Sequence, residues 1–291
     1  MPIHSTLTVR EGTRPAPSRT GQSDPTLAVL VPTRNEAGNV EELLRRISTS
    51  VAHIPTQIMF IDDSHDATPD VIRAVARRGG GGACQVSLIH RQGSQRTGGL
   101  GGAVVDGLRA VSTPWACVLD GDLQHPPEVI PTLLAKAESE GADLAVASRY
   151  CGQGRSDGLG LVRTLVSAGC TWAAKLLFPG RLRGVTDPMS GFFLVRRSAV
   201  NLDELRPRGF KILLELLVRG RDLHLTEVEF VFADRHAGES KGSLRQGLTY
   251  VGSLGELRLG RGTRSPSRSG VGAAEVELLA PLTQYMGTVG A

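Results

Sequence analysis

A series of short apolar runs separated by helical segments is the feature that most constrains how this chain can fold. The runs do not alternate apolar and polar residues, which is typical of strands covered on both faces. Strands of this kind, joined by helices, predict an α/β domain with a mainly parallel sheet and helices on both faces. The predicted strands span residues 27–31, 56–61, 86–89, 115–119, 143–147 and 226–232.

Helix signals fill the segments between these strands. Asn39 is a favourable helix cap, and Thr68 followed by Pro69 is a typical helix start. The longest apolar segment is interrupted by two cations, which favours a half-buried or interfacial helix over a membrane span. The predicted helices span residues 39–48, 68–78, a segment from the glycine-rich loop 98–102 to about residue 111, 127–140 and 161–178.

The two ends of the chain differ in composition from its middle. Residues 1–26 are rich in Thr, Ser, Pro and Arg and are predicted to be a disordered tail. The folded domain is predicted to span residues 27–241. An apolar stripe at helical spacing then predicts an amphipathic helix over residues 242–259, and residues 260–291 are predicted to be a second disordered tail.

Charge and composition argue against several classes of protein. A net charge of +4 and an aromatic content of 4% indicate no nucleic-acid partner. Four cysteines without metal spacing or the density of a disulfide scaffold indicate a reducing compartment. The sequence has no run of about 18 uncharged apolar residues, so no transmembrane helix is predicted. The first residues lack the apolar core of a signal peptide. We therefore expect a cytoplasmic protein.

A metal site is predicted where the strand 115–119 ends. Asp120 and Asp122 follow it on either side of a glycine, and a His-Pro-Pro sequence prevents the strand from continuing. Asp120, Asp122 and Gln124 offer oxygen ligands, which suit a hard divalent cation, Mg²⁺ or Mn²⁺, that also holds substrate phosphates. A polar turn is the alternative interpretation, because Asp-x-Asp is a common sequence. His125 is interpreted as a turn residue.

Other predicted strands also end in polar residues. Asn35 and Glu36 follow the first strand, Asp62 and Asp63 follow the second, and Arg91 follows the third. Ligands of parallel α/β sheets bind at the carboxyl ends of the strands. The sequence therefore predicts a ligand site at this edge of the sheet, with ordinary solvated loops as the alternative.

A set of motifs occurs in order along the chain. They are Pro32-Thr33-Arg34-Asn35-Glu36, Ile61-Asp62-Asp63-Ser64, Asp120-Gly121-Asp122-Leu123-Gln124-His125-Pro126-Pro127, Ser148-Arg149-Tyr150, Asp187-Pro188-Met189-Ser190-Gly191-Phe192 and Gly238-Glu239-Ser240-Lys241. Their order resembles the family 2 glycosyltransferases of the polyprenyl-phosphate (dolichyl-phosphate) mannose synthase type, over about Leu27 to Lys241. The resemblance implies a GT-A-type nucleotide-sugar-binding domain.

The resemblance also implies an activity, the inverting, metal-dependent transfer of a hexose, mannose first, from a nucleotide diphosphate sugar to a polyprenyl phosphate. GDP-mannose is the favoured donor, and the lipid acceptor implies a peripheral enzyme at the cytoplasmic face of a membrane. Transfer of glucose or another sugar is one alternative. A catalytically idle nucleotide-sugar-binding or scaffold protein is another, favoured by Arg34 and Gly99, where relatives often have Tyr and a basic residue.

The resemblance also implies which residues bind each part of the substrates and the metal, and some residues belong to more than one of these groups. The nucleotide sugar is expected at Pro32, Asn35, Glu36, Asp62, Asp63 and Asp120, and the metal at Asp120, Asp122 and Gln124. The acceptor phosphate is expected at Arg149, Arg163, Ser167, Ser190, Arg235 and Lys241, with Asp122, Arg149 and Arg235 as catalytic residues. The alternatives are that Glu36 is an early helix charge, Ser190 a turn residue, and the basic residues ordinary surface charges.

Overall fold

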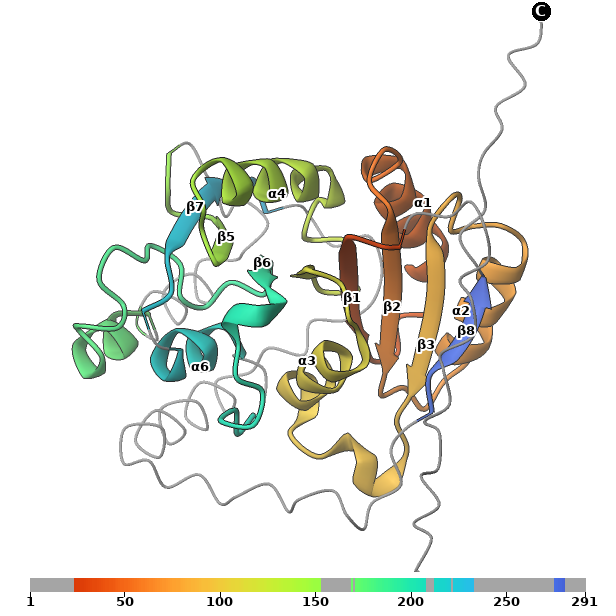
Figure 1. Cartoon of the computed structure of the whole chain (residues 1–291). Helices are drawn as coiled ribbons and strands as arrows, with labels where there is room; N and C mark the ends of the chain where they lie inside the picture. The colour runs from red at the N-terminus through yellow and green to blue at the C-terminus, as the bar shows by residue number, and fades with distance from the viewer. Residues whose placement is uncertain are drawn as a thin grey trace, which may run out of the picture.

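An eight-stranded sheet forms the centre of the domain, with the strand order β7-β5-β6-β4-β1-β2-β3-β8 (Figure 1). The computed structural model describes residues 24–152, 169, 171–207, 212–220, 222–232 and 275–280. The strands are β1 Leu27–Thr33, β2 Thr56–Asp62, β3 Gln85–His90, β4 Trp115–Val118, β5 Leu144–Ser148, β6 Phe193–Arg196, β7 Leu225–Glu229 and β8 Glu277–Ala280.

Most neighbouring strands are parallel, which confirms the predicted sheet type. β1 pairs in parallel with β2 and β4, β2 with β3, and β5 with β7. β6 runs antiparallel to β4 and β5, and β8 runs antiparallel to β3. Thr33 pairs with Asp62, and Asp62 pairs with His90, so the carboxyl ends of β1, β2 and β3 lie in register at one edge.

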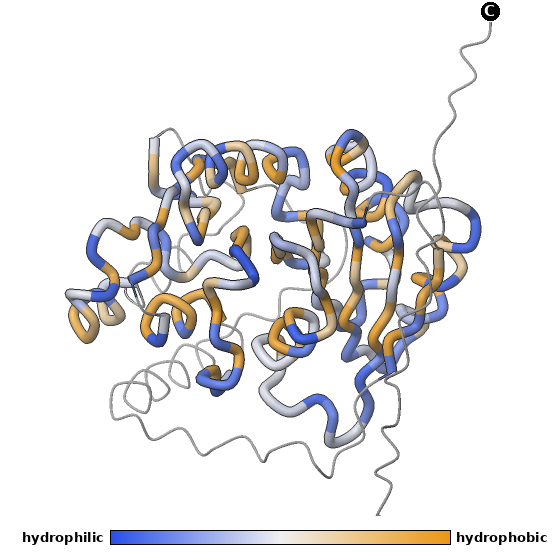
Figure 2. Tube along the Cα trace, in the orientation of Figure 1, coloured by the Kyte–Doolittle hydropathy of each residue, from blue (hydrophilic) through white to orange (hydrophobic). Residues whose placement is uncertain are grey.

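Helices cover both faces of the sheet, as predicted. Leu27, Val29 and Val31 of β1 are buried in one apolar core with α1, α2 and α4, whereas Ala28 and Leu30 are buried in a second core with α3 and α6. Apolar residues accordingly line the strands in Figure 2. The helices are α1 Val40–Ser50, α2 Thr68–Arg77, α3 Gly99–Ala110, α4 Ile130–Ser139 and α6 Ile212–Arg219, with short 3-10 turns at Gly93–Arg96, Pro127–Val129 and Arg197–Ala199.

Two strands lie outside the predicted set. β6 returns the chain antiparallel between β4 and β5, and β8 adds a strand beside β3. The prediction of a disordered tail over 260–291 is therefore wrong for Glu277–Ala280. The predicted helix 242–259 and almost all of the predicted N-terminal tail lie outside the described residues.

The glycine-rich segment 98–102 is the start of a helix and not a free loop. α3 begins at Gly99, and Gly98 precedes it with φ +82°, a conformation that glycine adopts readily. A Cβ at Gly98 would lie 2.9 Å from the carbonyl oxygen of Pro207, and one at Gly102 would lie 2.1 Å from that of Thr97. Glycine is thus needed here because the backbone is closely packed.

Of the predicted apolar helix 161–178, the structure describes a helical stretch at residues 171–177. Ala174 is buried, whereas Trp172 and Leu176 are 68% and 64% exposed. In the described part of the chain, no helix has the length and apolar character needed to cross a membrane.

Candidate active site

The loop after β4 carries the predicted metal ligands and curls back on itself. The Asp120 backbone N–H donates a hydrogen bond to His125 Nδ1 (3.1 Å), and the Gln124 N–H donates to Asp122 Oδ1 (3.2 Å). Leu123, at φ +64°, allows the reversal in a backbone conformation that is uncommon for such a residue. We call residues 120–125 the acidic loop.

The acidic loop fits a hard divalent cation that is also bound by a substrate. Asp122 and Gln124 are buried, while the side chain of Asp120 is 37% exposed. Within the described residues, no group of three or more Asp, Glu, His or Cys side chains gathers as a metal cage. Asp120, Asp122 and Gln124 offer two carboxylates and an amide oxygen, and Mg²⁺ is commonly held by one or two carboxylates together with substrate phosphates.

His125 differs from its interpretation as a turn residue, because it is buried. Its ring lies 5.5, 5.8 and 5.6 Å from the rings of Phe192, Phe230 and Phe232. Burial lowers the pKa of His125, so the neutral imidazole is favoured near neutral pH and can accept the Asp120 N–H. The enclosing phenylalanines follow β7 or precede β6, far along the sequence, so no local pattern indicated this role.

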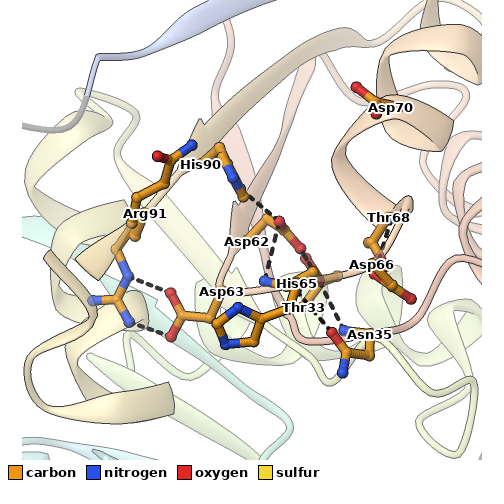
Figure 3. A network of polar contacts seen from close by, with 12 residues as sticks. Thr33, Asn35, Asp62, Asp63, His65, Asp66, Thr68, Asp70, His90 and Arg91 are labelled. Atoms are coloured by element: carbon orange, nitrogen blue, oxygen red, sulfur yellow. Dashed lines mark hydrogen bonds and ion pairs between the residues drawn. The ribbon is translucent and has the colours of Figure 1, made fainter.

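Asp62 is at the predicted edge, but its carboxylate faces inward. It accepts hydrogen bonds from Thr33 Oγ1 (2.8 Å), from the backbone N–H (3.2 Å) and hydroxyl of Ser64, and lies 2.8 Å from His90 Nδ1 (Figure 3). The side chain of Asp62 has no exposed surface. In this conformation it joins the ends of β1, β2 and β3, and its direct contact with the nucleotide sugar stays a prediction.

The carboxylate of Asp63 is held by Arg91, a buried residue that the sequence predicted only as a polar residue at the end of the third strand. Arg91 Nε and Nη2 donate to the two carboxylate oxygens of Asp63 (2.8 and 2.6 Å), as Figure 3 shows. Nη1 donates to Asp106 (3.1 Å) and Nη2 also donates to the carbonyl of Gly99 (2.9 Å). The Arg91 side chain is fully buried. A guanidinium therefore lies at the segment where Gly99 replaces the basic residue of many relatives.

Asn35 and Glu36 lie at the same edge, in the loop after β1. Asn35, at φ +57°, donates its backbone N–H to Ser64 Oγ (2.8 Å) and accepts the His65 N–H at Oδ1 (3.0 Å). Glu36 Oε2 accepts a hydrogen bond from Asn39 Nδ2 (2.7 Å). The Asn39 side chain thus makes no helix-capping bond, contrary to its prediction. Pro32 lies within β1 beside this loop.

On the acceptor side, Arg149 is held by a fully buried carboxylate. Its Nε and Nη2 donate to Asp187 (2.8 and 3.0 Å), and its guanidinium lies 5.3 Å from the Tyr150 ring and 5.7 Å from the Phe232 ring. Glu227 Oε1 accepts the backbone N–H groups of Thr186 (2.8 Å) and Asp187 (3.4 Å). This arrangement fixes where Arg149 presents its positive charge.

Ser190 fits the turn alternative. Its Oγ donates to the carbonyl of Ala147 (2.7 Å) and accepts the N–H of Phe192 (3.1 Å), and the residue is buried. Its expected contact with an acceptor phosphate stays a prediction. The other expected acceptor residues, Arg163, Ser167, Arg235 and Lys241, lie outside the described residues.

The acidic loop and the acceptor side meet at Gly191. A Cβ at Gly191 would lie 2.8 Å from Asp120 Oδ2 and 3.0 Å from His125 Cε1, so glycine favours this close approach. β6 starts opposite the end of β4, which brings residues 187–192 to the edge where the acidic loop emerges. The predicted metal ligands thus lie close to the segment that holds Arg149.

A family model and curated relatives both match this chain over most of its described domain. The model of the family described as glycosyl transferase family 2 matches residues 28–202. A dolichol-phosphate mannosyltransferase of Pyrococcus furiosus is 38% identical over 74% of this chain and 58% of its own length. Relatives of the same name from Mycosarcoma maydis and Saccharomyces cerevisiae are 32% and 31% identical, over 81% and 79% of this chain and 80% and 86% of theirs. This chain thus spans little more than half the length of the archaeal relative.

Solved structures with the same fold support the GT-A-type architecture. Glucosyl-3-phosphoglycerate synthase from Mycobacterium tuberculosis, in complex with Mn²⁺, UDP and its product, has a TM-score of 0.58 at 19% identity, over 82% of this chain and 80% of that chain. Mannosyl-3-phosphoglycerate synthase from Rubrobacter xylanophilus has a TM-score of 0.55 at 19% identity, over 81% and 74%. At these identities the likeness concerns the fold alone.

Proposed function

Since this chain belongs to glycosyl transferase family 2, we propose that it transfers mannose, with inversion, from GDP-mannose to a polyprenyl phosphate. The observation that carries the proposal is the position of Arg149, which is fixed by Asp187 beside the acidic loop. An enzyme with a phosphate acceptor requires a positive charge that positions the acceptor next to the diphosphate, and the Arg149 guanidinium is held beside the predicted diphosphate position. The relatives named dolichol-phosphate mannosyltransferase support mannose and a polyprenyl phosphate as the substrates.

The chemistry needs positioning more than it needs a base. A phosphate monoester has its second pKa near ~6, so at neutral pH it is largely a dianion and can attack without losing a proton to the protein. One phosphate oxygen forms a bond to the anomeric carbon while the bond from that carbon to the nucleoside diphosphate breaks. The configuration inverts, and the nucleoside diphosphate leaves with the electron pair.

Each side of the site has a proposed role in this step. Asp122, with Asp120 and Gln124, would hold Mg²⁺ or Mn²⁺, which stabilises the charge that develops on the leaving diphosphate. Arg149 would orient the acceptor phosphate, together with Arg163, Ser167, Arg235 and Lys241 by their match to the family's motifs. Asn35, Glu36 and Asp63 would hold the nucleoside, with Asp63 oriented by Arg91.

A labelled-product assay tests the function. With radiolabelled GDP-mannose, a polyprenyl phosphate and Mn²⁺, we expect label to enter a lipid-extractable product. UDP-glucose should give much less product, and calorimetry should find GDP bound more tightly than UDP. Tighter binding of UDP would contradict the mannose assignment. Nucleotide binding without any lipid product would instead support the scaffold alternative.

Because the proposed acceptor is a lipid, we also propose that the enzyme works at an anionic membrane surface. Trp172 and Leu176 lie one helical turn apart and are mostly exposed, beside Lys175. An apolar helix face flanked by cations is typical of segments that lie in the membrane interface. Basic residues near such a surface contribute roughly 1 kcal/mol each, an attraction that salt screens.

Vesicle sedimentation tests the membrane surface. The protein should sediment with anionic vesicles at low salt and be released at high salt, and Trp172→Glu combined with Leu176→Glu should strongly reduce sedimentation. Leu278→Glu is the matched control, because Leu278 is also mostly exposed but lies on β8, beside β3. Equal sedimentation of the double variant and the control would show that residues 171–177 do not contact the membrane.

A further inference from the structure

The acidic loop is bridged by a hydrogen bond from the backbone of its first residue to the side chain of its last. The Asp120 N–H donates to His125 Nδ1 at 3.1 Å. A ring nitrogen that accepts a hydrogen bond carries no proton, so the imidazole proton must lie on Nε2. This bond spans the whole loop and so fixes the distance between its two ends.

The imidazole itself is held rigidly by groups from distant parts of the chain. The rings of Phe192, Phe230 and Phe232 surround it at 5.5–5.8 Å, and the residue is only 3% exposed. A Cβ at Gly191 would lie 3.0 Å from His125 Cε1 and 2.8 Å from Asp120 Oδ2, so a larger residue at position 191 would crowd both side chains. The position of His125 is therefore determined by β6 and by the residues after β7, and not by the loop alone.

The backbone of the acidic loop needs such an outside support. Leu123 has a left-handed backbone conformation, at φ +64°, which is unfavourable for a side chain of this size. Strained backbone of this kind persists where surrounding contacts over-determine it. The bond to His125 is one of the contacts that hold this conformation, and it ties the backbone of Asp120 to the far end of the loop.

We propose that His125 is a positioning residue for the cation site, acting through the Asp120 backbone N–H. The inference rests on the proposed metal-dependent function, because it concerns how Asp120 and Asp122 are set for the same ion. His125 touches neither substrate nor ion in this role. His125 would act like other residues that hydrogen-bond to metal-binding residues without touching the metal. Loss of such a residue typically weakens metal binding by about 10- to 100-fold.

Three variants separate positioning from packing. His125→Leu removes the acceptor but keeps an apolar side chain in the aromatic pocket. His125→Asn keeps an acceptor, since Asn Oδ1 occupies nearly the place of His Nδ1. Phe230→Leu is the matched packing control, because it loosens the same pocket while the hydrogen bond to Asp120 is retained.

Mn²⁺ affinity in the presence of GDP, measured from free Mn²⁺ by electron paramagnetic resonance, is the main readout. His125→Leu is expected to weaken Mn²⁺ binding about 10- to 100-fold, with GDP binding in chelator unchanged. His125→Asn should recover most of the loss, and Phe230→Leu should lower the melting temperature while leaving Mn²⁺ affinity near that of the wild type.

Each contrary outcome has a definite meaning. If His125→Leu binds Mn²⁺ as tightly as the wild type does, the positioning role alone is overturned. The same holds if Phe230→Leu loses as much Mn²⁺ affinity as His125→Leu. A wild-type protein that binds no Mn²⁺ with GDP would overturn both this role and the metal-dependent function. If His125→Leu does not fold, ¹⁵N spectra of the wild-type histidines, assigned with His125→Asn, decide the matter: a protonated Nδ1 would overturn the inference.

Discussion

Replacing Asp122 with asparagine is expected to slow mannosyl transfer at least ~100-fold, comparable to the loss of one strong electrostatic element of an active site. The substitution removes a negative charge from the acidic loop but keeps an oxygen that can accept the Gln124 N–H, so the loop should retain its shape. The loss should therefore appear mainly in kcat, measured as the initial rate of lipid-linked product at saturating donor.

Asp70→Asn is the matched control for that experiment. Asp70 is a carboxylate on α2 that is 79% exposed and pairs with Arg73, so its replacement changes the net charge equally without touching the site. Its transfer rate should match the wild type. An unchanged rate in Asp122→Asn, or full activity of the wild-type protein in chelator, would remove the cation from the mechanism.

Arg91→Met is expected to lower the free energy of unfolding by about 3–5 kcal/mol, because removing one partner of a buried ion pair leaves charge uncompensated. Arg91 is fully buried, and its partners Asp63 and Asp106 have side chains that are only 11% and 10% exposed. Both carboxylates would lose their counter-charge at once. Urea unfolding, followed by circular dichroism, measures the difference.

Arg73→Met provides the comparison, since Arg73 also contacts two carboxylates. Its partners Asp70 and Glu277 are 79% and 40% exposed, so the loss should be no more than ~1 kcal/mol. Adding Asp63→Asn to Arg91→Met should recover part of the lost stability, because it removes one of the two uncompensated charges. Equal losses for the two arginine variants would show that burial gives the Arg91 pairs no special weight.

The sequence predicted the parts of the fold that depend on local pattern. Unalternating apolar runs predicted β1 to β5 and the mainly parallel sheet, because a strand covered on both faces must be apolar on both. β6 and β8, each of four residues, were not predicted. β8 also pairs with a strand nearly two hundred residues earlier, and such a distant pairing has no local signal.

The sequence predicted which residues lie near the candidate site better than it predicted the contacts that these residues make. Arg149 and the acidic loop are where the motif order indicated, at one edge of the sheet. The protein contacts of Asp62, Ser190 and His125 were not predicted, because they depend on which groups surround these residues: Asp62 and Ser190 bond to protein partners, and His125 is enclosed by phenylalanines brought together by the sheet. Tertiary contacts of this kind cannot be obtained from spacing along the chain.

The antiparallel strand β8 has a consequence for how the protein behaves in solution. Without it, β3 would be the last strand of the sheet and would present unpaired backbone N–H and C=O groups, a template for strands of other molecules. β8 pairs with β3 from Leu88 to Val86, and Glu277 is tied to α2 through Arg73 (2.9 Å). Residues 277–280 therefore shield the half of the sheet formed by β1, β2 and β3 against edge-to-edge aggregation, a protection that a truncation before residue 277 would remove.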